Sequence, residues 1–147
     1  MGKIVNARKT TAKELLKLAP PVIICSSRPD FEGTILENGY TQVSLNKHLS
    51  SMIAGLDIKA IRLCLADKIR EIIPNNSDPI YLTDYEMLFD PRYELDVVRL
   101  FIEISRKNKL IVKWCGKGTE ESLSYAEQGF VDYKQYKISD YDVAIVI

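Results

Sequence analysis

Short apolar runs alternate with amphipathic segments along most of the chain. Unbroken apolar runs predict buried strands at residues 22–25, 80–83, 110–114 and 143–147, and an alternating, β-branched run predicts another at 41–45. Strands that are apolar on both faces and lie between helices are typical of a parallel sheet that is covered on both sides. The pattern therefore predicts an α/β fold with about five mainly parallel strands and helices on both faces.

Helices are predicted between these strands from start signals and from apolar spacing. Thr11 and Glu14 have the spacing of a capping box, and a helix over 11–18 ends before two prolines. Asn46 is placed to cap a short helix over about 47–54. Apolar residues then recur at intervals of three and four in two longer helices. The predicted buried faces of these two helices are formed by Ile58, Ile61, Leu65, Ile69 and Ile72, and by Val97, Leu100, Phe101 and Ile104.

The size and composition of the chain narrow the class of protein. A chain of 147 residues has the size of one domain, and we expect a single domain over 1–147. Its 20 Lys and Arg balance 20 Asp and Glu, so no overall field attracts nucleic acid or an anionic membrane. Cys25, Cys64 and Cys115 lie far apart, which argues against a zinc site or a disulfide framework. Without a long apolar run or signal-like start, we expect a cytoplasmic protein with no membrane partner.

The segment after the first strand stands where a phosphate-binding loop would be. On the pattern G-x-x-x-x-G-K-[ST], Ser27 and Glu32 take the places of the two glycines, Gly33 takes the place of the lysine, and only Thr34 fits. The lysine charge that neutralises phosphates is therefore missing, and Glu32 would repel them. We expect a degenerate loop over 26–34 that binds nucleotide weakly or not at all.

Arg28 and Asp84 complete the candidate nucleotide site. Arg28 is an alternative cation, because a guanidinium binds phosphate through two parallel hydrogen bonds. The strand over 80–83 ends in Asp84, which is the Walker B arrangement, in which a carboxylate holds magnesium. Ligands of parallel sheets bind beyond the carboxyl ends of the strands, so we expect Asp84 to lie near the 26–34 loop. The alternative is that Asp84 only caps the helical turn that follows it.

Two further features leave alternatives open. A stretch of repeated positive charge could contact DNA backbone, or it could be a solvated edge of the sheet. It consists of Arg106, Lys107, Lys109, Lys113 and Lys117. The polar segment 115–140 is rich in tyrosine, and the hydrophobic pattern assigns no element to it. Tyr125, Tyr133, Tyr136 and Tyr141 could form an interface with another protein or a lid over the sheet.

Segments in the second half of the chain carry a family resemblance. They are residues 83–91, 104–108, 114–116 and 123–127, within a stretch of about 80–136. These segments resemble the small P-loop protein of the BREX phage-defence system. The resemblance implies a three-layer P-loop NTPase-like core of the ASCE/AAA type that acts alongside larger BREX proteins, which restrict phage DNA. It also makes Thr34 the counterpart of the P-loop hydroxyl and Asp84 the counterpart of the Walker B acid.

These observations lead to one main hypothesis and two alternatives. The main hypothesis is a non-hydrolysing or weakly nucleotide-binding accessory subunit of a BREX-type antiphage complex, with other BREX proteins as partners and DNA reached through the complex. Under this main hypothesis, we expect no enzyme activity and no cofactor. One alternative is an active small ATPase that uses ATP and magnesium through Thr34 and Asp84. The other alternative is a module that contacts DNA or another protein directly.

Overall fold

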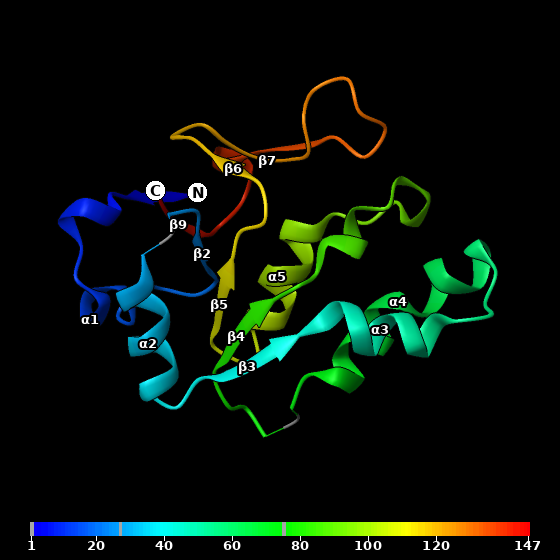
Figure 1. Ribbon diagram of the computed structural model, residues 1–147, viewed down its shortest axis with the longest axis horizontal. Helices are drawn as coiled ribbons and strands as arrows, with labels where there is room; N and C mark the ends of the chain where they lie inside the picture. The colour runs from blue at the N-terminus through cyan, green and yellow to red at the C-terminus, as the bar shows by residue number, and fades with distance from the viewer. Residues whose placement is uncertain (1, 27, 75) are drawn as a thin grey trace.

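The main sheet of the molecule is parallel and has six strands. The computed structural model describes residues 2–26, 28–74 and 76–147 (Figure 1). In these residues the strands run in the order β1-β9-β2-β5-β4-β3, and every neighbouring pair is parallel. The strands are β1 (Lys3–Val5), β2 (Val22–Ile24), β3 (Thr41–Ser44), β4 (Ile80–Thr83), β5 (Leu110–Lys113) and β9 (Ala144–Val146). The predicted α/β fold with a parallel sheet is confirmed, and β1 is an additional edge strand.

Helices cover both faces of this sheet. They are α1 (Ala12–Leu15), α2 (Pro29–Glu37), α3 (Leu45–Ile53), α4 (Ile58–Ile72) and α5 (Val97–Ser105). Short 3₁₀ helices stand at Ala7–Lys9 (η1), Glu86–Phe89 (η2), Pro91–Tyr93 (η3) and Ile138–Asp140 (η4). The first helix is shorter than the predicted 11–18, although Thr11 caps it as expected by accepting from the Glu14 amide.

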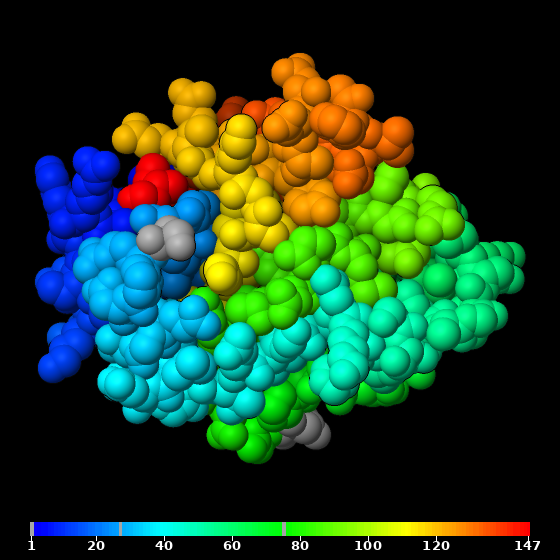
Figure 2. Space-filling view, in the orientation of Figure 1, coloured from blue at the N-terminus to red at the C-terminus, as the bar shows by residue number. Residues whose placement is uncertain are grey.

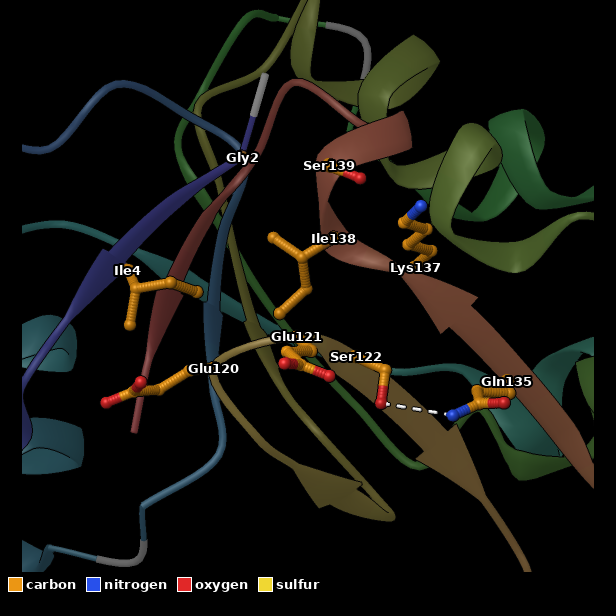
Figure 3. A pocket seen from close by; sticks show the side chains of 9 residues that line it. All are labelled: Gly2, Ile4, Glu120, Glu121, Ser122, Gln135, Lys137, Ile138 and Ser139. Atoms are coloured by element: carbon orange, nitrogen blue, oxygen red, sulfur yellow. Dashed lines mark hydrogen bonds between the residues drawn. The ribbon is translucent and has the colours of Figure 1, made fainter.

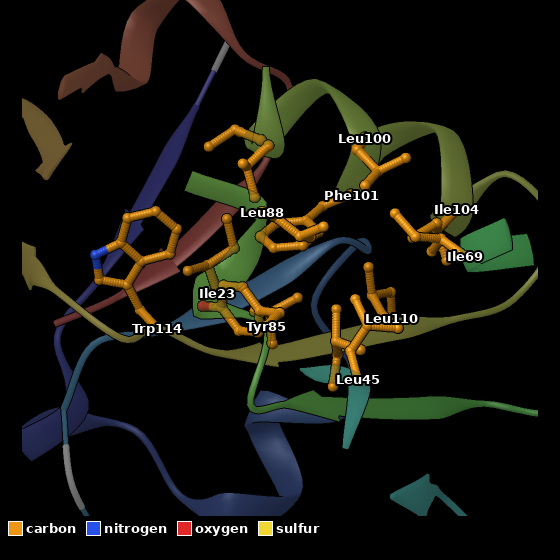
Figure 4. Packing of buried hydrophobic residues seen from close by; sticks show 14 of the residues in the cluster. Ile23, Leu45, Ile69, Tyr85, Leu88, Leu100, Phe101, Ile104, Leu110 and Trp114 are labelled. Atoms are coloured by element: carbon orange, nitrogen blue, oxygen red, sulfur yellow. The ribbon is translucent and has the colours of Figure 1, made fainter. Parts of the chain in front are cut away.

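Alternate residues of each central strand enter two separate apolar clusters. In β2, Val22 and Ile24 pack with Phe31 of α2, whereas Ile23 packs with the residues of α3, α4 and α5. This follows from the period of two along a strand, and it explains why strands buried on both faces are apolar throughout. The larger cluster contains Tyr85 and Phe101, whose rings meet edge to face at 5.2 Å (Figure 4).

A second, antiparallel sheet of three strands packs over one end of the main sheet. Its strands are β6 (Lys117–Gly118), β7 (Ser122–Tyr125) and β8 (Lys134–Lys137). Phe89 and Tyr125 stack with ring centroids 4.0 Å apart, and Trp114 meets Phe89 edge to face at 5.7 Å. The Trp114 indole N–H donates to the Ser124 carbonyl at 3.1 Å. Tyr125, Tyr136 and Tyr141 all make ring contacts within the molecule, which is the behaviour that the lid interpretation predicts.

Gly116 is required where the two sheets approach each other. A Cβ atom at this position would collide with the Ser124 carbonyl oxygen. The chain can therefore pass from β5 into the second sheet only because residue 116 has no side chain. The close passage keeps the second sheet against the end of β5.

The stacked aromatic rings give a test of this packing. Phe89 is 1% exposed, and Phe89→Ala removes its contacts with Tyr125, Trp114 and Tyr85. We expect the free energy of unfolding to fall by about 3–5 kcal/mol, because a buried aromatic ring is lost and a cavity remains. Urea denaturation followed by circular dichroism measures this change. Leu63→Ala is the control, since Leu63 is 78% exposed and its loss should leave stability nearly unchanged.

Candidate functional site

The carboxyl ends of the central strands meet at one edge of the main sheet. Ile24 is in register with Lys113, and Thr83 is in register with Ser44. A cleft of about 310 Å³ opens at this edge. It is lined by Glu32, Gln42, Thr83, Asp84, Glu86, Lys113, Trp114 and Cys115. The cleft thus lies where ligands of parallel sheets bind, beyond the ends of β4 and β5.

Asp84 is exposed at the end of β4 and has a left-handed backbone. Its φ is +51°, a conformation that Asp tolerates better than most residues. The Ser44 hydroxyl donates to Asp84 Oδ2 at 2.6 Å. The following helix η2 has Tyr85 at its N-cap, with no side-chain capping bond. The interpretation of Asp84 as a helix cap is therefore wrong, because its carboxylate pairs with the neighbouring strand, and its role with magnesium stays a prediction.

Asn46 bridges the start of α3 to the turn after β4. Its amide nitrogen Nδ2 donates to Glu86 Oε2 at 2.8 Å, and its Oδ1 accepts from the Met87 backbone N–H at 3.2 Å. The Asn46 backbone N–H also donates to the Asp84 carbonyl at 2.6 Å. The predicted capping role of Asn46 is wrong, since α3 starts at Leu45 and Asn46 lies inside it. Its side chain instead fixes the turn that carries Asp84 and Glu86.

Helix α2 begins earlier than a phosphate-binding loop requires. Only residues 25–28 connect the end of β2 to Pro29, the first residue of α2. Thr34 therefore lies in the second turn of the helix, and Gly33 has no atom within 4 Å of the position its Cβ would take. The predicted loop over 26–34 is therefore wrong for residues 29–34, which belong to α2. Proline fits the first turn of a helix and acidic residues favour it, as Asp30 and Glu32 do here.

Arg28 is directed toward the amino-terminal segment. Its guanidinium donates to the carbonyls of Ala7 and Thr10, and it pairs with Asp30, with Nη2 and Oδ2 2.7 Å apart. It also lies over the Phe31 ring, 4.3 Å from the centroid. Arg28 thus holds η1 against α2 and does not line the cleft. Of the predicted nucleotide-binding residues, Ser27 lies outside the described residues and, among the others, only Asp84 lines the cleft.

The predicted basic stretch is divided between two ends of the sheet. Arg106, Lys107 and Lys109 precede β5, and Lys113 and Lys117 stand at its other end or beyond it. A strand of this length separates Lys109 from Lys113 by about 13 Å. The five cations therefore do not form one surface. Lys113 alone among them lines the cleft, together with the carboxylates of Glu32, Asp84 and Glu86.

The thiol in the cleft is not an activated nucleophile. Burial raises the pKa of Cys115 to about 12, and burial raises the pKa of Cys25 to about 12 as well. Both thiols are therefore protonated at neutral pH, whereas nucleophilic attack needs the thiolate. Among the described residues, no group of three or more His, Cys, Asp or Glu side chains has the arrangement of a metal site.

A second, larger cavity lies between β1, η4 and the second sheet. Its volume is about 700 Å³, and Ile4, Glu121, Ser122, Gln135 and Ile138 are among the residues around it (Figure 3). Gln135 donates to the Ser122 hydroxyl at 3.3 Å across this cavity. None of the predicted site residues lines it. The smaller cleft at the carboxyl edge is therefore the candidate functional site.

A scan against protein-family models and searches of curated proteins and solved structures returned no match to this chain. Within the described part of the chain, no helix has the length and apolar character needed to cross a membrane.

Removal of the Asn46 bridge should reduce the local protection of backbone amides from hydrogen exchange. Asn46→Ala deletes the two side-chain hydrogen bonds to Glu86 and Met87. We expect a loss of about 1–3 kcal/mol in unfolding free energy and faster hydrogen exchange at the Met87 amide. Gln42→Ala is the matched control, because Gln42 makes a single long hydrogen bond of 3.4 Å to Thr83. Equal exchange at Met87 in both variants would contradict the bridge.

Proposed function

We propose that this chain is a P-loop-like domain that does not hydrolyse nucleotide and acts as an accessory subunit of a BREX-type antiphage assembly. One observation supports the proposal that nucleotide is not hydrolysed. Four residues connect β2 to α2, and the cleft beyond them presents three carboxylates, those of Glu32, Asp84 and Glu86, against the single ammonium of Lys113. A site for a triphosphate needs more positive than negative groups.

The strand order supports the P-loop-like part of the proposal. The ASCE/AAA-like core that the resemblance implies has one strand between the strand leading into the phosphate loop and the strand ending in the Walker B acid. Here β5 lies between β2 and β4. The order β9-β2-β5-β4-β3 agrees with such a core, with β1 added at the edge beside β9. In this proposal, Asp84 is the counterpart of that acid.

The start of α2 supports the absence of phosphate binding. Helix N-termini bind anions through free backbone N–H groups and the positive end of the helix dipole. Pro29 has no N–H, and the Phe31 N–H is already bonded to the Arg28 carbonyl at 3.1 Å. Asp30 and Glu32 in the first turn also compensate the dipole. Little of the usual attraction for phosphate is left at this helix end.

The assignment to a BREX-type assembly rests on the family resemblance, and the fold adds one supporting fact. Three of the resembling segments, 83–91, 114–116 and 123–127, contain Phe89, Trp114 and Tyr125, whose rings pack together. Three of the segments that carry the resemblance therefore meet in one aromatic cluster beside the cleft. No observation on the described residues favours the alternative of direct DNA contact, since the basic stretch is divided.

Nucleotide binding and turnover test the proposal. We expect isothermal titration of the protein with ATP and magnesium to give no saturable heat, and phosphate release to equal that of buffer. The expected reason is the cation-poor cleft. Asp84→Ala should behave like the unchanged protein in both assays. A micromolar dissociation constant, with phosphate release that Asp84→Ala abolishes, would establish the ATPase alternative.

The accessory role is tested in a host that carries the larger BREX proteins. Deletion of this chain should remove protection against phage in a plaque assay, and Asp84→Ala should retain it. The protein should also co-elute with at least one of the larger BREX proteins in size-exclusion chromatography. Full protection after deletion, together with the absence of co-elution, would end the accessory proposal.

A further inference from the structure

An apolar groove adjoins the cleft on the side of the second sheet. It lies between the turn over 86–93 and the loop over 126–133 that joins β7 to β8, and its volume is about 440 Å³. Met87, Phe89, Tyr93 and Val131 contribute apolar surface to it. Figure 2 shows the orange 126–133 loop beside the yellow-green 86–93 segment on one face of the molecule.

The loop above the groove exposes two neighbouring apolar side chains. Phe130 is 64% exposed and Val131 is 88% exposed. Val131 lines the groove, and Phe130 precedes it in the loop. Exposed apolar residues are common singly, but an adjacent pair next to an apolar groove is typical of a binding surface. The base of the loop is held by the stack of Tyr125 on Phe89, with ring planes 5° apart. The exposed pair is thus presented from a fixed support.

The charge left uncompensated at the groove is negative. Asp90 is neutralised by Arg92, whose Nη2 lies 2.7 Å from Asp90 Oδ2. Glu86 and Asp132 also line the groove, and within the described residues neither carboxylate has an ion-pair partner. Glu86 accepts from Asn46 through Oε2, so its other oxygen remains available. The pKa of Tyr125 is raised first by burial and then by several negative charges, including those of Asp132 and Glu86.

Glu86 belongs to both the groove and the cleft. It lines the 440 Å³ groove together with Val131, and it lines the 310 Å³ cleft together with Asp84 and Glu32. The cleft also contains the ammonium of Lys113, so its three carboxylates outnumber its cations. A basic side chain paired with Glu86 would therefore have two further carboxylates on one side and apolar surface on the other. Nucleic acid and anionic lipid are disfavoured by the sign of this charge.

We propose that the groove and the adjoining cleft bind an extended segment of a partner protein in which a basic side chain is followed by apolar side chains. The basic group pairs with Glu86 and points into the cleft, where an arginine can bond a carboxylate through two parallel hydrogen bonds. The apolar side chains pack on Phe130, Val131 and Met87. This inference rests on the proposed accessory function, because it supplies the surface through which such a subunit engages its partner.

Short peptides test the charge and the apolar contact separately. The probes are acetyl-Leu-Arg-Leu-Leu-amide and the same peptide with citrulline, which is uncharged, in place of arginine. Trp114 is the single tryptophan of the chain and lines the cleft, so its fluorescence reports binding. We expect a saturable change with the arginine peptide, about tenfold weaker affinity for the citrulline peptide, and weaker binding of the arginine peptide as salt rises.

Matched variants locate the site. Glu86→Gln keeps an oxygen that can accept from Asn46. It should lower the affinity for the arginine peptide about tenfold and leave the affinity for the citrulline peptide unchanged. The double variant Phe130→Ser with Val131→Ser should lower the affinity for both peptides. Glu121→Gln and Leu63→Ser are controls away from the groove and should change neither affinity. Circular dichroism confirms that each variant is folded.

Three results would overturn the inference. They are the absence of saturation by the arginine peptide up to several millimolar, equal affinity of the unchanged protein and Glu86→Gln, and a dimer in analytical ultracentrifugation that the Phe130→Ser, Val131→Ser variant dissociates. The last result would make a second copy of the chain the occupant. ATP turnover alongside peptide binding would instead overturn the non-hydrolysing function and leave the groove in place, so the two failures are distinguishable.

Discussion

The parallel pairing of β2, β5 and β4 determines the composition of the site. Parallel neighbours end at the same edge of a sheet, and the register places Ile24 beside Lys113 and Leu82 beside Val112. The residues just beyond these ends, which are far apart in the sequence, therefore share one cleft. This constraint brings Asp84, Glu86 and Lys113 together, and it places the close passage at Gly116 beside them.

At this edge of the parallel sheet, the early start of α2 removes the geometry that a phosphate-binding loop would have. The short connection after β2 leaves no room for a wide loop, and the alternative cation Arg28 is engaged elsewhere, since it binds the amino-terminal segment and Asp30. The cleft instead keeps the carboxylates of Asp84 and Glu86, which lie on the turn that Asn46 fixes, and that of Glu32 on α2. A site arranged in this way is suited to a positively charged group of a partner, and this links the proposed accessory function to the groove beside the cleft.

The sequence predicted the elements whose signal is local. Strands β2, β4, β5 and β9 were found because they are apolar and buried on both faces, and β3 was found because its residues alternate and are β-branched. The edge strand β1 was missed because it is short and only half-buried, and β7 and β8 were missed because each has a single buried residue, Leu123 and Tyr136. Helix α2 was not predicted, because the phosphate-loop pattern favours a loop over 26–34, although Pro29 is a strong signal for a helix start.

The site itself was predictable only in part. Asp84 was found because an acid after a buried strand is visible in the sequence, and its position at the sheet edge follows from parallel pairing. Apart from Asp30, the hydrogen-bond partners of the Arg28 and Asn46 side chains were not predictable, since they are 18 to 41 residues away along the chain. The same holds for the separation of the basic residues, which are neighbours in sequence but lie at opposite ends of β5.

The claim that the turn after β2 cannot hold a triphosphate is tested most directly by nuclear magnetic resonance. The ¹⁵N-labelled protein would be titrated with magnesium and a non-hydrolysable ATP analogue, and the backbone amides of residues 25–34 and of Asp84 would be followed. The account predicts that these signals stay in place at millimolar nucleotide. Saturable shifts confined to these amides would contradict it.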